Sequence, residues 1–170
     1  MQIKKLTSVK MIVAVISSLL LFSNSSQAED APSTTIKRLT MESANAAALA
    51  TIEACRKEGV QITATVVDKN GLVQAVMRDT LAPHVSIDIS RMKAYTAVNF
   101  STDTSALISR ADTSIGRIDG LVMSAGGAII NVGGTIYGAV GVSGAPSGET
   151  DEKCAKAGVA AIAEDLEMAD

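Results

Sequence analysis

Residues 61–78 read QITATVVDKNGLVQAVMR, and this stretch decides the fold. From 62 to 67, every second residue points to one face and the residues between point to the other, the period of a β-strand. Asn70-Gly71 is a favoured turn between antiparallel strands. The alternation then resumes from Leu72 to Arg78. The stretch therefore predicts a β-hairpin with strands over 61–68 and 72–78.

Helical and strand patterns flank this hairpin. Apolar residues at three- and four-residue steps predict helices, with Thr40 and Ser86 as N-caps and Gly59 ending the first. The predicted helices cover 40–57, 86–99, 104–110 and a final segment from near Thr150, and further strands cover 120–124, 128–132 and 135–142. Gly138 and Gly141 interrupt the last strand, where they mark bulges or close approach of another group. Strands joined by hairpins favour an α+β fold: a mainly antiparallel sheet of about five strands flanked by helices.

The first 28 residues have the pattern of a secretory signal. Three lysines precede an apolar run over 11–22, and Ser26-Gln27-Ala28 offers the small residues of a cleavage site. The run is shorter than the roughly 20 apolar residues of a spanning helix, which disfavours an uncleaved membrane anchor. We therefore expect a signal peptide (1–28), a flexible leader (29–37) and one domain (38–170). The expected location is periplasmic or secreted, with no stable membrane insertion after processing.

Charge and cysteine content restrict the function further. Three of the 15 Lys and Arg lie in residues 1–28, which leaves 12 against 18 Asp and Glu and a formal charge of −6. An acidic chain without a basic cluster is a poor binder of nucleic acid. Cys55 and Cys154 could form a disulfide in an oxidising compartment, or they could be two buried thiols, and the spacing leaves both open. A Cys-x-x-Cys metal motif, a phosphate loop, a hydrolase elbow and a dinucleotide fingerprint are absent from the sequence.

Two blocks of sequence resemble one known family. The first comprises VDKNGLV (67–73), Arg78, APH (82–84) and SIDISRMKAYTA (86–97), and the second runs from Gly126-Gly127 through GAVGVSG (138–144) to Asp151-Glu152. Over residues 36–168 the chain is similar to the GlcG/HbpS family of haem-binding proteins. The resemblance implies a profilin-like α-β-α sandwich, assembly into a homo-oligomer and haem as the ligand. Ala128-Ile129 stands where the family usually has a proline, which affects the expected pocket edge and not the fold.

Four residues are the predicted ligand-binding set. His84, the single histidine, is the candidate iron ligand, because haem is commonly held by one axial imidazole. Arg78 and Lys93 could pair with the haem propionates, and Tyr95 could donate a hydrogen bond or ligate iron. The loop residue Asp79 could orient His84 or Arg78. We expect a ligand-sized cleft beside the 82–86 turn; the alternative for each residue is an ordinary surface or core side chain.

These observations favour a periplasmic protein that binds a small molecule, haem or a related tetrapyrrole. One alternative is an enzyme or accessory subunit acting on a small oxidised metabolite, with Lys93 or Tyr95 transferring a proton. Another is an oligomeric interaction protein, since small Ala- and Gly-rich surfaces pack closely. The sequence shows no paired carboxylates or activated nucleophile, so no catalytic residue is predicted.

Overall fold

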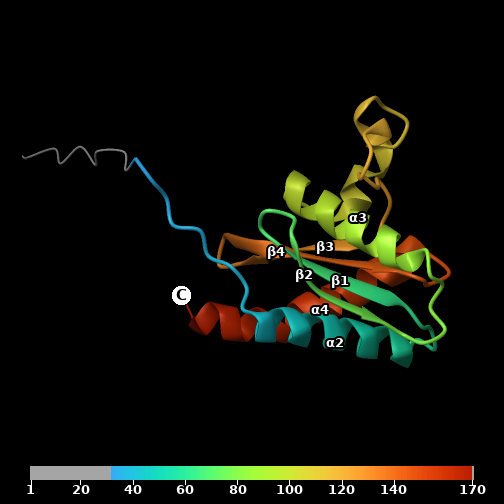
Figure 1. The fold of residues 1–170 in the computed structure, drawn as a ribbon, viewed down its shortest axis with the longest axis horizontal. Helices are drawn as coiled ribbons and strands as arrows, with labels where there is room; N and C mark the ends of the chain where they lie inside the picture. The colour runs from blue at the N-terminus through green and yellow to red at the C-terminus, as the bar shows by residue number, and fades with distance from the viewer. Residues whose placement is uncertain (1–31, 170) are drawn as a thin grey trace, which may run out of the picture. The chain divides into compact units, whose positions relative to one another are not determined.

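A four-stranded antiparallel sheet carries the fold, in the order β2-β1-β4-β3. The strands are β1 (Thr63–Asp68), β2 (Val73–Arg78), β3 (Gly127–Val132) and β4 (Thr135–Ser143). Helices α2 (Met41–Lys57) and α4 (Gly148–Met168) cover one face, and α3 (Ser86–Phe100) lies on the other (Figure 1). This arrangement confirms the expected α-β-α sandwich, with one strand fewer than predicted.

The computed structural model describes residues 32–169, so the predicted signal peptide lies outside the described residues. Residues 32–37 form no helix or strand and are exposed. A compact unit begins at Ile36. Within the described range, no helix combines the length and apolar character needed to cross a membrane.

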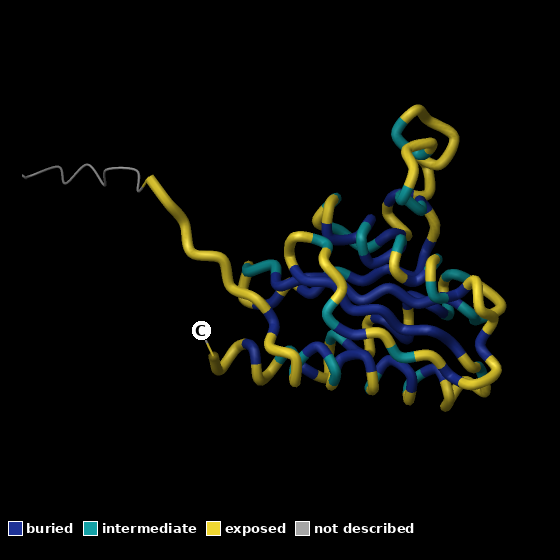
Figure 2. The backbone as a smooth tube through the Cα atoms, viewed as in Figure 1, coloured by how far each residue is buried: buried dark blue, intermediate teal, exposed yellow. Residues whose placement is uncertain are grey.

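The β1–β2 hairpin forms as predicted, and β1 is buried on both faces (Figure 2). Ile62, Ala64 and Val66 belong to the larger core cluster, which α2 and α4 cover, whereas Val67 belongs to a smaller cluster under α3. Gly71 makes the turn with φ 80°, a conformation that glycine adopts without strain. The alternation in the sequence therefore identified the two buried faces correctly.

Glycine lets the helices approach the sheet and each other closely. A Cβ at Gly141 in β4 would lie 2.0 Å from the Ser90 carbonyl oxygen of α3. A Cβ at Gly158 in α4 would lie 1.9 Å from Thr51 Oγ1 of α2. The predicted close approach at Gly141 is thus the contact between β4 and α3.

The strand predicted over 120–124 was wrong. Gly120 has φ 88°, and the Val122 N–H donates to the Thr96 hydroxyl of α3 (2.9 Å) in place of a strand partner. The segment returns from a projecting arm, formed by η1 (Thr104–Arg110), η2 (Ile115–Arg117) and the residues to 119, most of which are exposed (Figures 1 and 2). The predicted short helix at 104–110 is present as a 3₁₀ helix.

Two predicted helix starts also differ from the structure. The N-cap of α3 is Val85, without a side-chain cap, because the Ser86 hydroxyl bonds to the Pro83 carbonyl and to Thr63. The last helix begins at Gly148 with Ser147 as its N-cap, slightly before the predicted start. Thr40 does cap α2, as predicted, by accepting from the Ser43 N–H.

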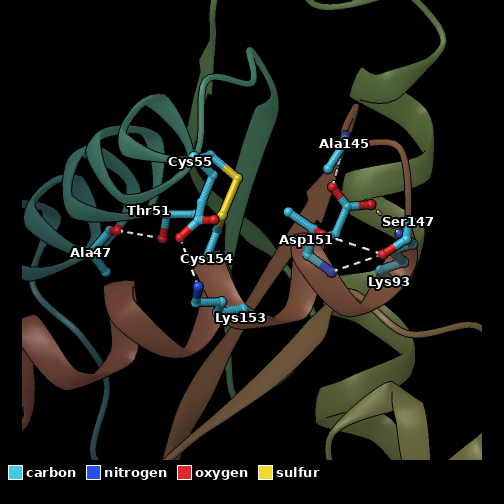
Figure 3. Close-up of a disulfide and its surroundings, with 11 residues drawn as sticks. Ala47, Thr51, Cys55, Lys93, Ala145, Ser147, Asp151, Lys153 and Cys154 are labelled. Carbon is cyan, nitrogen blue, oxygen red and sulfur yellow. Dashed lines mark hydrogen bonds and ion pairs between the residues drawn. A yellow bond between two sulfur atoms is a disulfide. The ribbon is translucent and has the colours of Figure 1, made fainter.

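Cys55 and Cys154 form a disulfide that joins α2 to the first turns of α4 (Figure 3). Both residues are buried, and 99 positions separate them in the sequence. Of the two alternatives that the sequence left open, the structure selects the bonded one. Closing so long a loop restricts the unfolded chain strongly.

We expect a Cys55→Ala/Cys154→Ala variant to be less stable by about 4 kcal/mol, because the unfolded chain regains the entropy of the open loop. Urea unfolding of oxidised wild type and variant measures the difference. The variant serves as its own control, since a thiol reductant should lower the wild-type midpoint and leave the variant's unchanged. Equal midpoints for the two oxidised proteins would contradict a stabilising disulfide.

Candidate functional site

The structure places the four predicted ligand residues in three separate places. Arg78 is the last residue of β2 and His84 lies in the loop that follows it, Lys93 lies in a buried ion pair with Asp151 of α4, and Tyr95 lies at the opposite end of the sheet. The Tyr95 ring packs against the hairpin turn, where a Cβ at Gly71 would lie 2.7 Å from its Cδ2. The predicted set is therefore not one site.

Arg78 holds the loop that carries His84. Its guanidinium donates to the carbonyl oxygens of Ala82 (2.5 Å) and Thr80 (3.4 Å), using Nη1 for both. The loop start is fixed as well, because buried Asp79 accepts from Arg56 Nε at 3.0 Å. Asp79 therefore orients Arg56, and neither Arg78 nor His84 as the sequence suggested. These contacts leave His84 exposed, with no hydrogen bond to its side chain among the described residues.

Helix α3 leaves β2 uncovered on one face. Hydroxyl pairs Ser86–Thr63 (2.6 Å) and Ser90–Thr65 (2.8 Å) seat the helix over β1. Val76 and Arg78 pair across the strands with Thr65 and Thr63, so they point to the same face as α3 but lie beside it. Few contacts join α3 to β2.

Exposed apolar side chains accompany His84 and Arg78. Leu81 is 77% exposed, Val85 58% and Val76 46%. We call these five residues, Val76, Arg78, Leu81, His84 and Val85, the β2 corner. Single exposed apolar residues are ordinary, whereas exposed apolar residues that form a contiguous patch are typical of binding surfaces.

The Lys93–Asp151 ion pair connects α3 to the first turn of α4 (Figure 3). Lys93 Nζ lies 2.9 Å from Asp151 Oδ2, and both side chains are 5% exposed. Asp151 Oδ1 also accepts from the Ala145 N–H (3.0 Å). Burial raises the pKa of Asp151 above its ordinary value, although the hydrogen bonds from Lys93 and Ala145 oppose this. Gly126 makes room for the ammonium, because a Cβ there would lie 2.4 Å from Lys93 Nζ.

Glu152, next in the chain, joins α4 to η1 and β3. Its carboxylate accepts from the backbone N–H and hydroxyl of Ser105, from the Gly126 N–H and from Lys156 Nζ. Burial raises the pKa of Glu152, but these hydrogen bonds outweigh it and hold the pKa below its ordinary value. Sequence analysis included Asp151 and Glu152 only in the family resemblance and missed their contacts, because Lys93, Ser105 and Gly126 lie 26 to 58 residues away in the chain.

Two clefts formed by described residues have none of the four predicted ligand residues in their linings. One of about 430 Å³ lies beside Glu152, and its lining residues are Ser105, Ala125, Glu149, Glu152, Lys153 and Lys156. The other, about 340 Å³, lies between residues 37–43 and the end of α4. Neither of these two clefts lies beside the 82–86 turn, and the residues of the β2 corner are exposed.

Comparisons with known proteins identify similar chains. Residues 39–160 match the family model described as HbpS-like, Haem degrading protein HbpS-like. No curated protein matches the chain. A double mutant of Streptomyces reticuli HbpS is 37% identical, with 78% of this chain and 92% of that chain covered and a TM-score of 0.72.

Two further solved structures are similar. A PduOC:Heme complex is 26% identical, with 74% of this chain and 96% of that chain covered and a TM-score of 0.68. Klebsiella pneumoniae ORFY is 24% identical, with 76% of this chain and 94% of that chain covered and a TM-score of 0.71. This similarity supports the fold.

We expect Lys93→Met to lower the free energy of unfolding by about 3–5 kcal/mol, because Asp151 then stays buried without its counter-charge. The double variant Lys93→Met/Asp151→Leu should recover much of that loss, since both charges are gone. Urea unfolding measures both. Lys153→Met is the matched control, because the Lys153–Glu58 pair is exposed and should contribute little. A double variant as unstable as the single one would contradict this account.

Glu152 should support stability above its unfolded pKa and lose that contribution as the pH falls. Its pKa is lower in the folded than in the unfolded protein, so the unfolded state takes up the proton first on acidification. Below the ordinary glutamate pKa of 4.5, the unfolding midpoint of Glu152→Gln should therefore fall less with decreasing pH than that of the wild type. Glu53→Gln, an exposed change on α2, is the control. The same dependence of the unfolding midpoint on acidic pH in wild type and Glu152→Gln would contradict the lowered pKa of Glu152.

Proposed function

The chain belongs to the HbpS-like family, and from this we propose that it binds haem or a related tetrapyrrole outside the cytoplasm. The PduOC structure, solved as a complex with haem, supports a haem ligand for a fold of this kind. The ligand-binding surface is the β2 corner, with His84 as the axial ligand to iron and Arg78 beside a propionate.

The observation that carries the proposal is the position of His84. The single imidazole of the chain is exposed at the end of a loop anchored by Arg78, Asp79 and Gln61, so it is both accessible and held in place. A neutral imidazole is a good ligand for iron. No other described residue combines exposure, a fixed loop and this chemistry.

The surroundings of His84 fit a flat, mainly apolar ligand with carboxylate groups. Leu81, Val85 and Val76 offer apolar contacts for the ring surface. Arg78 uses only Nη1 for its two carbonyl contacts, which leaves its other N–H groups to donate to a propionate. Haem bound there would supply iron as the atom that the imidazole holds, and the protein would retain the ligand.

Export is supported by two independent features. Residues 1–28 have the order of a secretory signal. The Cys55–Cys154 disulfide belongs to the kind of bond that persists in oxidising compartments. A periplasmic or secreted haem-binding protein agrees with both.

Lys93 and Tyr95 stay predicted ligand residues that lie away from the β2 corner. For Lys93 to bind a ligand or transfer a proton, its ion pair with Asp151 would have to open, which leaves a buried charge without a partner. Proton transfer by Lys93 depends on that step, and the Tyr95 ring packs against the hairpin turn, so haem binding at the β2 corner is the better supported function.

Haemin added to the purified protein should give a shifted Soret band, and His84→Ala should weaken binding by at least about tenfold, because the axial bond is lost. Absorption titration measures both. Asp119→Ala, an exposed change in the arm, is the control and should bind as wild type does. Wild type without a shifted band, or His84→Ala with unchanged affinity and spectrum, would refute the assignment.

The same haemin titration also tests the contact between Arg78 and a propionate. Arg78→Gln should weaken binding by about tenfold through loss of a charge-assisted hydrogen bond. Arg117→Gln is the matched control, since Arg117 is also exposed and also donates to a backbone carbonyl. Equal affinities for the two variants would place the propionates elsewhere.

A further inference from the structure

We propose that the cleft of about 430 Å³ beside Glu152, here called the Glu152 cleft, binds a free α-amino acid. The ammonium group of the ligand pairs with Glu149, and its carboxylate pairs with Lys153 and Lys156. The volume lies in the range of small-molecule sites. The cleft shares no lining residue with the β2 corner, so this is a second site, independent of haem binding.

Glu149 is an exposed carboxylate that lacks a cation. Lys153 follows it by four residues on α4, a spacing and order at which glutamate and lysine commonly pair on a helix. Lys153 pairs instead with Glu58, at the end of α2, at 2.6 Å. Among the described residues, Glu149 takes part in no ion pair. Hydrogen bonds from its own backbone N–H and from Ser147 lower the pKa of Glu149, so it stays ionised and can accept a cation.

The two lysines of the Glu152 cleft keep donors for an anion. An ammonium group has three N–H donors. Lys153 Nζ donates to Glu58, and Lys156 Nζ contacts Glu152 at 2.8 Å and Asp103 at 3.0 Å. The Lys153 and Lys156 side chains are 69% and 54% exposed, so their remaining donors are accessible. A ligand carboxylate can accept charge-assisted hydrogen bonds from them.

The spacing of these charges suits an α-amino acid. Glu149 and Lys156 lie two helical turns apart, which is about 10 Å along α4. The ammonium and carboxylate of an α-amino acid are attached to one carbon, so the ligand with one hydrogen bond at each end spans on the order of 9 Å. Ala125 and the methylene groups of the two lysines offer apolar contact to its side chain.

The mixture of charges favours a zwitterion over a simple anion or cation. Glu149 and Glu152 line the cleft together with Lys153 and Lys156, so both signs are present. An anion alone would bind close to the unpaired carboxylate of Glu149, and an amine alone would leave the lysine donors unused. A ligand that carries both charges complements both sets of groups.

Isothermal titration calorimetry of the full chain, expressed with its own leader, tests the proposal with leucine, alanine and glycine as probes. We expect one leucine to bind per chain. N-acetyl-leucine lacks the ammonium charge and leucinamide lacks the carboxylate charge. Each should therefore bind at least about tenfold more weakly than leucine.

Two variants assign the charges of the ligand to residues of the cleft. Glu149→Gln should weaken leucine binding about tenfold and leave N-acetyl-leucine binding unchanged, because that compound has no ammonium group. Lys153→Met should weaken leucine binding and leave leucinamide binding unchanged. Glu164→Gln is the matched control, since Glu164 is also exposed on α4 and lines neither cleft. If Glu149 only stabilised the start of the helix, its variant would change the unfolding midpoint and not the affinity for leucine.

Three results would overturn the proposal. The first is a wild type that binds none of the three amino acids. The second is equal affinity of the wild type for leucine and leucinamide, which would show that the carboxylate is not recognised. The third is equal affinity of wild type and Glu149→Gln for leucine, which would place the amino acid on another surface.

Discussion

The buried Lys93–Asp151 ion pair is the interaction on which the arrangement of layers depends. Helices α3 and α4 lie on opposite faces of the sheet, and this pair links them past its end. It requires Gly126, whose missing side chain leaves room for the ammonium, and it fixes the first turn of α4. Glu152 extends the link to Ser105 and Gly126, and the disulfide at Cys154 holds the next turn to α2. One short stretch of α4 thereby positions elements from every part of the domain.

Much of this framework could be predicted from local sequence. The hairpin was predicted because alternation and Asn70-Gly71 are local signals, and Gly59 and Thr40 marked the ends of α2 in the same way. The prediction of a strand over 120–124 was wrong because its apolar residues have the pattern of a short strand. Its N–H at Val122 bonds instead to Thr96, 26 residues earlier, a contact that no local pattern reports. The prediction of Ser86 as an N-cap was wrong for a similar reason, since its hydroxyl bonds to Thr63 across the helix–sheet contact.

The sequence singled out residues of the candidate site, but it could not show their long-range contacts or their exposure. Residue type and the family resemblance singled out His84 and Arg78, and Arg78 donates to the Ala82 carbonyl in the loop that carries His84. Lys93 was predicted to pair with a propionate, yet its partner Asp151 is 58 residues away in the chain, so the sequence could not reveal that its charge is already matched. Exposure was equally hidden, because nothing in the order of residues tells that Leu81 and Val85 face water while Ala82 between them is buried.

The small side chains that build the sandwich also determine where a large ligand can bind. Gly141 and Gly158 bring α3 onto β4 and α4 onto α2 at backbone contact distance, and alanines fill much of the core. Layers packed so closely leave little room between them for a flat ring system. The aromatic groups that usually line a deep pocket are scarce as well: beyond residue 28 the chain has only Tyr95, Phe100 and Tyr137. A tetrapyrrole bound to such a fold would therefore lie on its surface, and the face of β2 that α3 leaves bare has exposed Val76 and Arg78, with exposed His84 in the loop that follows the strand.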